Sequence, residues 1–308
     1  MELAIIVLNW NAATDTIRCI HTISTWRRLR PIIWVVDNGS TDNGAEIIYQ
    51  ECPYVHLIRS ETNLGFAGGN NLGISQAIAV AKAPILLLNN DALIAEEDAA
   101  QLLDTLQTVP HIGFVGPLLL DAEDRKQLLA AGGRNPVFHH HSHIRKLNPG
   151  EPIREVEYVV GTVLLARPEV FQQVGLLDED YFFSMEVADL CMRARRQGYI
   201  SVVDTRAHAY HALGRSSRLR ETLHTYYIIR NRFLFISKFY SGPLKLLLRG
   251  FWTLYSLALG TKLVLSGKPA TAQAVRLGLL DGLCGRFGGQ NERVLACVIH
   301  PSSNQAQT

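Results

Sequence analysis

Four short apolar runs near the start of the chain each end abruptly in polar residues. The runs are 3–8, 32–36, 55–58 and 85–88, and stretches with helical spacing of apolar residues follow them. Runs of this length predict buried parallel strands. Because strands that alternate with helices form parallel sheets with right-handed crossovers, we expect the polar strand ends to gather on one edge. The pattern predicts an α/β protein with a ligand site at that edge.

The polar residues at these strand ends are the first candidates for ligand binding. They are Asn9 and Asn11, Asp37 and Asn38, and Asn89, Asn90 and Asp91. Asp91 stands where a metal or a phosphate could bind. The alternative is that Asn89 to Asp91 form a turn before a helix whose first turn is Glu96-Glu97-Asp98, because Asn and Asp favour turns.

The third run leads into a glycine-rich segment at 63–73. Its candidate residues are Asn63, Gly65, Phe66, Gly68 and Asn70. The glycines could let the backbone approach a phosphate, or they could form a tight loop with positive φ. The segment matches neither GxGxxG nor GxxxxGK[ST], so it is not a nucleotide-binding fingerprint of either kind.

The second half of the chain supplies further candidate residues. We predict a strand over 158–165, a short helix over 168–174 and a charged helix over 186–196. On that charged helix Glu186 and Asp189 are three residues apart and share a face. One of these carboxylates could accept a proton, or the helix could be a surface helix with ion pairs.

A histidine and a polar loop follow the predicted strand at 200–203. His211 precedes Gly214-Arg215-Ser216-Ser217. Arginine and hydroxyl groups suit phosphate oxygens. A carboxylate, a histidine and a diphosphate would make a plausible octahedral site for one divalent ion.

Charge is distributed unevenly along the chain. The 308 residues carry a net charge of +2 and are 47% hydrophobic, which is ample for a core. Residues 217–293 contain twelve Lys and Arg against three acidic residues, a net charge of +9, so the remainder carries −7. Within this basic region the stretches 222–239 and 244–265 predict aromatic, basic helices. No recognised motif in them indicates nucleic-acid binding.

The helix at 244–265 has two interpretations. Arg249 and Lys262 interrupt it, which leaves too short an apolar stretch to span a membrane. Basic residues beside Trp and Leu suit a helix lying on an anionic membrane surface. The alternative is a helical cap packed on the rest of the protein.

The cysteines and the first residues of the chain indicate the cellular compartment of the protein. The five cysteines are widely spaced and form no CxxC pair, which favours a reducing compartment and argues against zinc. The first residues lack the basic stretch of a signal peptide. We therefore expect a cytoplasmic protein.

Four of these segments, in this order, resemble inverting family 2 glycosyltransferases of the GT-A fold, and their rhamnosyltransferase-like branch in particular. The segments are 36–42, 63–70, 88–91 and 186–193, and the resemblance covers residues 3 to about 235. It implies a Rossmann-like nucleotide-sugar-binding fold with a mostly parallel central sheet and a C-terminal helical extension. The implied domains are a catalytic domain at 1–216, with a nucleotide-binding half at about 1–120 and an acceptor half at about 156–216, and a helical extension at 217–308.

The resemblance also implies roles for individual residues. Asn9 and Asn11 match residues lining the nucleotide pocket, and Asp37 matches the aspartate that recognises the base. Asn89 and Asp91 stand at the family's DxD motif, with Asp91 as ligand of Mg²⁺ or Mn²⁺, and His211 matches the downstream metal histidine. The expected reaction moves a sugar, with dTDP-rhamnose as a candidate donor, to a lipid-linked or polysaccharide acceptor at the inner face of a membrane. The anomeric carbon would be inverted.

Two departures from the family pattern matter. Asn89 replaces the first acid of the DxD motif but keeps an oxygen ligand. Val187 replaces an acid that relatives often use as the base, so Glu186 is the best remaining base and Asp189 the next. If neither acts, the chain is a non-catalytic nucleotide-sugar binding or scaffold protein. A nucleotidyltransferase is disfavoured, because 9–15 contains neither glycine nor lysine.

Overall fold

The computed structural model describes residues 1–147, 150–212 and 218–299. The chain separates into two compact units. The sheet unit comprises Met1–Asp178 and Val187–Gly214, and the helical unit comprises Glu179–Glu186 and Arg215–Thr308. The boundary at 216 and the two predicted halves of the catalytic domain stay predictions.

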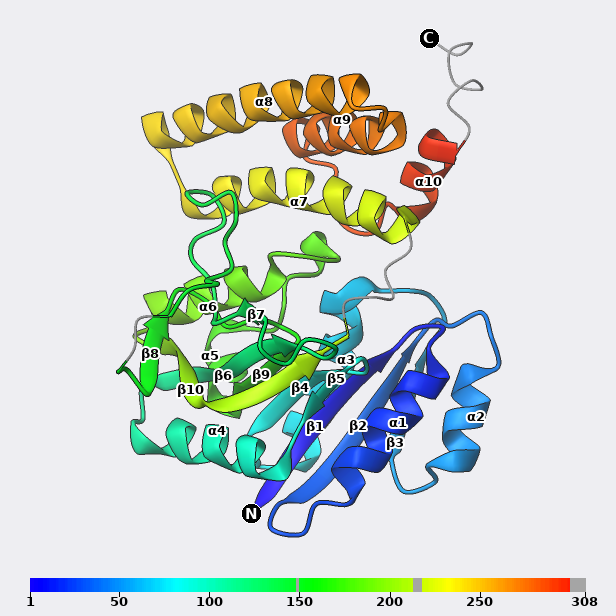
Figure 1. The fold of residues 1–308 in the computed structure, drawn as a ribbon, viewed down its shortest axis with the longest axis vertical. Helices are drawn as coiled ribbons and strands as arrows, with labels where there is room; N and C mark the ends of the chain where they lie inside the picture. Colours follow the sequence, from blue (N-terminus) through cyan, green and yellow to red (C-terminus); the bar gives the residue numbers. More distant parts are fainter. Residues whose placement is uncertain (148–149, 213–217, 300–308) are drawn as a thin grey trace. The chain divides into compact units, whose positions relative to one another are not determined.

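A single ten-stranded sheet forms the centre of the sheet unit (Figure 1). The strand order is β3-β2-β1-β4-β9-β6-β10-β5, with β7 beside β6 and β8 beside β10. The strands are β1 (Glu2–Asn9), β2 (Arg30–Asn38), β3 (His56–Ser60), β4 (Ile85–Asn89), β5 (Ala92–Ile94), β6 (Ile112–Asp121), β7 (Leu128–Ala130), β8 (Ile153–Val156), β9 (Val163–Ala166) and β10 (Ile200–His211). The four predicted runs are thus β1 to β4, and they form a parallel half-sheet.

The parallel register brings the predicted polar residues to one edge. Asn9 pairs with Asp37 across β1 and β2, and Leu8 pairs with Asn89 across β1 and β4. Beyond β4 the sheet is mixed, because β9 runs antiparallel to both β4 and β6. The α/β fold class is confirmed, with the parallel pairing concentrated in the first half.

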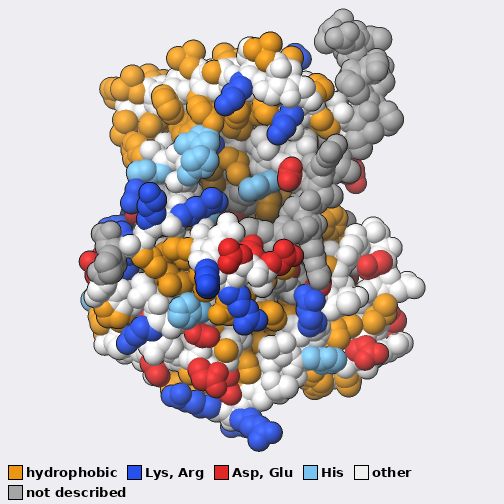
Figure 2. Space-filling view, in the orientation of Figure 1, with side chains coloured by type: hydrophobic (Ala, Val, Ile, Leu, Met, Phe, Trp, Pro, Cys, Tyr) orange, Lys and Arg blue, Asp and Glu red, His pale blue; other side chains and the backbone are white. Residues whose placement is uncertain are grey.

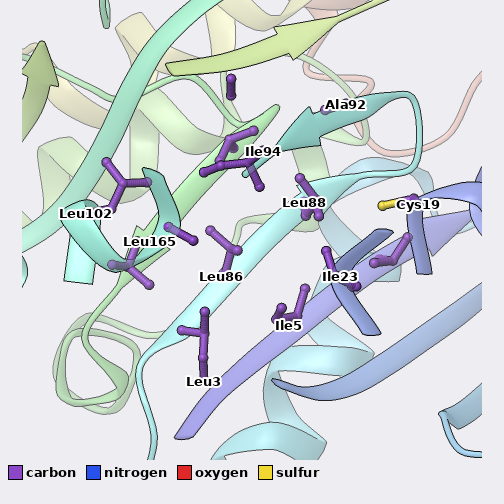
Figure 3. Packing of buried hydrophobic residues seen from close by; sticks show 14 of the residues in the cluster. Leu3, Ile5, Cys19, Ile23, Leu86, Leu88, Ala92, Ile94, Leu102 and Leu165 are labelled. Carbon is purple, nitrogen blue, oxygen red and sulfur yellow. The ribbon is translucent and has the colours of Figure 1, made fainter. Parts of the chain in front are cut away.

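Helices cover both faces of the sheet. They are α1 (Ala13–Ser24), α2 (Gly44–Glu51), α3 (Gly65–Val80), α4 (Glu96–Thr108), α5 (Pro168–Val174), the short 3₁₀ helix η1 (Glu179–Tyr181) and α6 (Glu186–Arg196). One core joins α1 and α4 to alternate residues of the strands. Figure 3 shows Ile5 and Leu86 of the sheet beside Ile23 of α1 and Leu102 of α4. Since the other residues of β1 and β2 face the opposite side, α3 has its own face of the sheet.

The glycine-rich segment is helical from Gly65 onward, so the tight-loop interpretation is wrong beyond Gly65, and the approach of its backbone to a phosphate stays a prediction. Gly65 begins α3 with a φ of +73°, while Gly69 and Gly73 lie inside the helix. A Cβ on Gly69 would lie 2.5 Å from the Leu8 side chain, and one on Gly73 would lie 2.6 Å from Ile6. These glycines therefore let the helix backbone lie directly on the sheet.

Three other expectations in the sheet unit need adjustment. The strand predicted over 158–165 is confined to β9, because the apolar residues at 158–162 are buried outside the sheet ladder. Asn90 and Asp91 lead first into the short strand β5, and only then into α4. The strand predicted over 200–203 continues as β10 to His211, past a register irregularity between Asp204 and His208.

In the described part of the helical unit, three long helices pack side by side, and a shorter one follows them (Figure 1). The helices are α7 (Arg218–Phe239), α8 (Gly242–Leu265), α9 (Pro269–Cys284) and α10 (Asn291–Ile299). Glycines allow close packing of α9 on α7, since a Cβ on Gly278 would lie 2.6 Å from the Tyr226 carbonyl oxygen. None of the helices in the described part of the chain is long and apolar enough to cross a membrane.

Candidate functional site

Polar side chains at the ends of β1 and β2 form a connected network. The Asn9 amide donates to Asp37 Oδ1 at 2.8 Å and to Ser40 Oγ at 3.2 Å, and Ser40 donates to the same Asp37 oxygen at 2.6 Å. Asn9 also accepts a hydrogen bond from Thr16 of α1 at 2.8 Å. Asn9 and Asp37 are buried, so this network holds the Asp37 carboxylate in a fixed position.

The network continues to two neighbouring segments. Asn11 has a φ of +50°, accepts from the Thr41 amide at 2.8 Å and donates its own backbone amide to Ser40 Oγ. Asn90 donates to Thr16 Oγ1 at 3.0 Å. The polar ends of β1, β2 and β4 are therefore joined by hydrogen bonds, as the parallel register predicted.

A second set of hydrogen bonds fixes the start of α3. Asn38 donates to Asn63 Oδ1 at 3.2 Å and to the Gly65 carbonyl at 3.0 Å, and accepts from the Leu64 amide at 2.9 Å. Asn70 donates to the Phe66 carbonyl at 2.9 Å. The side chains of Asn38, Asn63 and Asn70 thus form hydrogen bonds within the protein. Gly68 is buried within the helix.

A cavity of about 640 Å³ opens beside Asp37. Its lining is largely polar and includes Ser40, Asp42, Asn43, Arg59 and Ser60. Ser40 and Thr16 were not among the predicted site residues. Ser40 lies within the segment 36–42, but the sequence does not show that its hydroxyl links the ends of β1 and β2.

Asp91 and His211 meet at the other end of this edge. Because β5 pairs antiparallel with β10, His211 lies opposite Ala92, the residue after Asp91. The Asp91 Oδ1 and His211 Nε2 atoms are 3.2 Å apart, and both side chains are more than four-fifths buried. Burial raises the pKa of the nearby Cys19 thiol to about 12, and the negative charge of Asp91 adds to this effect.

These two side chains fit part of a divalent-metal site. A carboxylate oxygen and an imidazole nitrogen, facing each other at this distance, are ligand types that Mg²⁺ or Mn²⁺ accepts. Within the described ranges, no group of three His, Cys, Asp or Glu residues could hold a metal by itself. Asn89 is the last residue of β4 and is half-buried, with its backbone amide bonded to the Thr162 carbonyl.

Glu186 belongs to the helical unit and follows a strained turn. Phe182, Ser184 and Met185 have φ values of +60°, +72° and +74°, a region that residues other than glycine rarely adopt. Glu186 is 6% exposed and begins α6.

Two buried residues of α7 hold this turn. The Arg230 guanidinium donates to the carbonyls of Asp180 and Tyr181 at 2.9 and 2.8 Å, and also to the Gly288 carbonyl. Asn231 donates to the carbonyls of Phe183 and Ser184 at 2.8 and 2.7 Å. Burial lowers the pKa of Arg230, but the carbonyls satisfy its donors. These bonds supply the constraint that a strained turn needs.

Asp189 has a different environment. It is fully buried and accepts a hydrogen bond from Arg193 Nε at 2.6 Å, four residues along α6. Arg193 in turn donates to the carbonyls of Val174 and Leu176. The Asp189 carboxylate therefore anchors the arginine that holds the segment after α5.

Val187 packs in an apolar position of the sheet unit. It is 5% exposed, and a Cβ on Gly161 would lie 3.0 Å from its Cγ2 and 3.2 Å from the Phe66 ring. Arg215 and Ser216 lie outside the described residues.

The parallel half-sheet with polar strand ends, the mixed half beyond β4 and the helices on both faces are the architecture of the GT-A fold. Residues 4–156 match the family model described as Glycosyl transferase family 2. The chain carries a glycosyl transferase family 2 domain, so the resemblance noted in the sequence is confirmed.

Known relatives agree with this assignment. The chain is 29% identical over 283 residues to the N-acetylglucosaminyl-diphospho-decaprenol L-rhamnosyltransferase of Mycobacterium tuberculosis, covering 82% of this chain and 90% of that protein. It is 27% identical over 249 residues to the low-salt glycan biosynthesis hexosyltransferase Agl10 of Haloferax volcanii, covering 78% and 77%.

A solved structure supports the fold. The mannosyltransferase PcManGT from Pyrobaculum calidifontis, in complex with GDP-Man and Mn²⁺, superposes with a TM-score of 0.58 at 14% identity. The match covers 92% of this chain and 87% of that one.

Proposed function

We propose that this protein is an inverting, metal-dependent glycosyltransferase that moves rhamnose from dTDP-rhamnose to a lipid-linked or polysaccharide acceptor. The facing pair Asp91 and His211 carries the proposal, because it offers metal ligands at the strand-end edge that also holds Asp37. The named activity of the Mycobacterium tuberculosis relative, an L-rhamnosyltransferase acting on N-acetylglucosaminyl-diphospho-decaprenol, supports the sugar and the lipid-linked acceptor.

The donor would bind along the edge formed by β1, β2 and β4. Asp37 lines the cavity and is oriented by Asn9 and Ser40, so it can accept hydrogen bonds from a base. Asn11, Asn89 and Asn90 complete the polar edge, with Arg215 and Ser216 proposed for the diphosphate. When bound, a divalent cation held by Asp91, His211 and Asn89 would act as a Lewis acid toward the departing nucleotide diphosphate.

Glu186 is the proposed general base. It would take the proton from the acceptor hydroxyl, whose oxygen then attacks the anomeric carbon opposite the leaving group and inverts it. The environment of Asp189 supports Glu186 over Asp189, since the Asp189 side chain is fully buried and already accepts a hydrogen bond from Arg193. We place this reaction in cell-surface polysaccharide synthesis, at the inner face of the cytoplasmic membrane.

Donor binding and turnover test this function together. Calorimetry with dTDP-rhamnose and Mn²⁺ should detect binding to the wild type, and Asp91→Asn should lower kcat/KM by roughly 10³-fold, an electrostatic loss of about 4 kcal/mol. Asp104→Asn is the matched control, because Asp104 is exposed on α4. A folded protein that neither binds nor consumes any nucleotide sugar would refute the proposal.

The base has its own test. Glu186→Gln should lower kcat by roughly 10²- to 10⁴-fold while donor affinity stays unchanged, because the base acts in the chemical step. Full transfer by Glu186→Gln would contradict this role.

Val187 favours one second candidate, a non-catalytic nucleotide-sugar binding or scaffold protein. Valine has no group that accepts a proton, and this residue is 5% exposed at the start of α6. Donor binding without turnover across a broad panel of acceptors would support that candidate instead.

A further inference from the structure

Helix α8 exposes large apolar side chains along its whole length. Their exposed fractions range from 45% at Leu244 to 84% at Leu265. The set comprises Leu244, Leu246, Leu247, Phe251, Leu254, Leu257, Val264 and Leu265. Figure 2 shows apolar side chains gathered over this helix. Monomeric soluble proteins rarely expose an apolar patch of this extent without a partner.

The other side of α8 is packed within the helical unit. Leu248, Trp252 and Ser256 recur every four residues and are buried. The Arg232 guanidinium lies 4.0 Å from the centre of the Trp252 ring, a cation–π distance. Arg249 donates to the Leu283 carbonyl at the end of α9. One face of α8 thus packs on the other helices of the unit, and the leucines of the opposite face are exposed.

The charge around this stripe is of one sign. Residues 222–280 contain eight Lys and Arg and no Asp or Glu. Arg230 and Arg232 are buried, while Lys262, Lys268 and Arg276 are exposed. A second copy of the chain meeting this face about a two-fold axis would bring equal positive charges together, which is unfavourable. An anionic surface complements both the charge and the leucines.

We propose that α8 lies in the plane of an anionic membrane, with its leucine stripe in the boundary between headgroups and acyl chains and its lysines on the phosphates. A helix of 24 residues is about 36 Å long, and the stripe runs from its first turn to its last. Contact along the full length requires the helix axis to lie parallel to the surface. This inference rests on the proposed function, because a lipid-linked acceptor would lie in a membrane. It adds the surface of the protein that binds that membrane.

Vesicle sedimentation tests the surface without any nucleotide sugar. The full chain should bind vesicles of phosphatidylcholine with phosphatidylglycerol, and added salt should weaken binding because the attraction is partly electrostatic. Leu247→Glu combined with Leu254→Glu should weaken binding by at least about tenfold, since two anchors leave the interface. Val80→Glu is the matched control, because Val80 is an equally exposed apolar residue at the end of α3.

The charge has a separate test. Lys262→Glu with Lys268→Glu should weaken binding to the anionic vesicles, with no change on phosphatidylcholine alone. Circular dichroism of each variant should match the wild type, because every substituted side chain is exposed.

Three outcomes would overturn the proposal. They are no binding to anionic vesicles, binding that the leucine variant leaves intact, or a wild-type dimer in solution that the leucine variant dissociates. The last would assign the stripe to a second copy. Calorimetric donor binding in lipid-free buffer is independent of these results, so failure of the membrane surface and failure of the proposed enzyme can be told apart.

Discussion

Helices α4 and α8 are both amphipathic, but they differ in what covers their apolar side. In α4, Leu102, Leu103 and Leu106 pack into the core against the sheet, and Glu96 and Asp98 of the first turn accept hydrogen bonds from the backbone of other segments. In α8, which is nearly twice as long, most leucines are exposed and only Leu248, Trp252 and Ser256 are buried. The apolar pattern of a helix therefore identifies a face that needs a partner. The partner itself is identified from the exposure and the charge that the structure shows.

The interiors of the two units differ in how polar they are. The main core of the sheet unit is aliphatic, and the polar network of Asn9 and Asp37 lies at strand ends. The helical unit buries Arg230, Asn231 and Asp281 among aromatic rings, with Tyr226 donating to Asp281 at 2.7 Å. Burial raises the pKa of the neighbouring Tyr227 hydroxyl to about 12, so both tyrosines remain hydrogen-bond donors at neutral pH.

The largest effect on stability is expected in the core of α4. Leu103→Ala should cost about 2–5 kcal/mol, because Leu103 is almost completely buried and the substitution leaves a cavity. Urea unfolding followed by circular dichroism measures this cost. A loss below about 1 kcal/mol would show that α4 is less tightly packed than its burial indicates.

A smaller loss is expected from the buried polar interior. Arg230→Met should cost about 3 kcal/mol, since it removes a buried guanidinium that donates to the carbonyls of Asp180, Tyr181 and Gly288. It should also lower kcat if the turn before Glu186 loosens. Thermal unfolding and turnover at a permissive temperature separate the two effects, and an unchanged melting temperature would contradict the structural role.

Asp204 of β10 provides a pH-dependent test of the sheet unit. Burial alone would raise its pKa, but hydrogen bonds from Arg206, Thr105 and Gln101 lower it below its ordinary value of 3.8. Because the folded pKa lies below the unfolded one, its stabilisation is present above about pH 4 and is lost as the pH falls through the folded value.

Asp204→Asn should therefore cost about 2 kcal/mol at pH 7 and less at pH 3. Urea unfolding of both proteins at the two pH values measures the difference. An equal cost at both would mean that Asp204 acts through packing and not through its charge.

The smallest effect is expected on the exposed side of α8. Leu254→Ala should change the unfolding free energy by no more than about 0.5 kcal/mol, because the side chain is 69% exposed. This is the direct counterpart of Leu103→Ala in α4. A cost comparable to that of Leu103 would mean that the leucine stripe already has a partner in lipid-free solution.

Much of the sheet unit could be predicted from local sequence. The runs that end at Asn9, Asp37 and Asp91 identify parallel strands and their polar edge, because short apolar segments followed by polar residues have few other interpretations. The register and the hydrogen bond between Asn9 and Asp37 agree with that prediction.

Other features depend on contacts between distant segments. Gly69 and Gly73 lie in α3 where a Cβ would clash with Leu8 and Ile6, and no local pattern contains these contacts. His211 lies beside Asp91 because β5 pairs with β10, and β5 is too short to show a strand pattern of its own. The turn before Glu186 is likewise held by residues of α7.

That turn has a consequence for the order in which the protein is made. The carbonyls of Asp180, Tyr181, Phe183 and Ser184 acquire the side-chain donors of α7 only when Arg230 and Asn231 have left the ribosome, more than forty residues after the turn itself. A nascent or truncated chain that ends at 216 contains Glu186 but lacks every one of these donors. The turn before Glu186 therefore gains these bonds late in synthesis, after the residues of the sheet unit have been made.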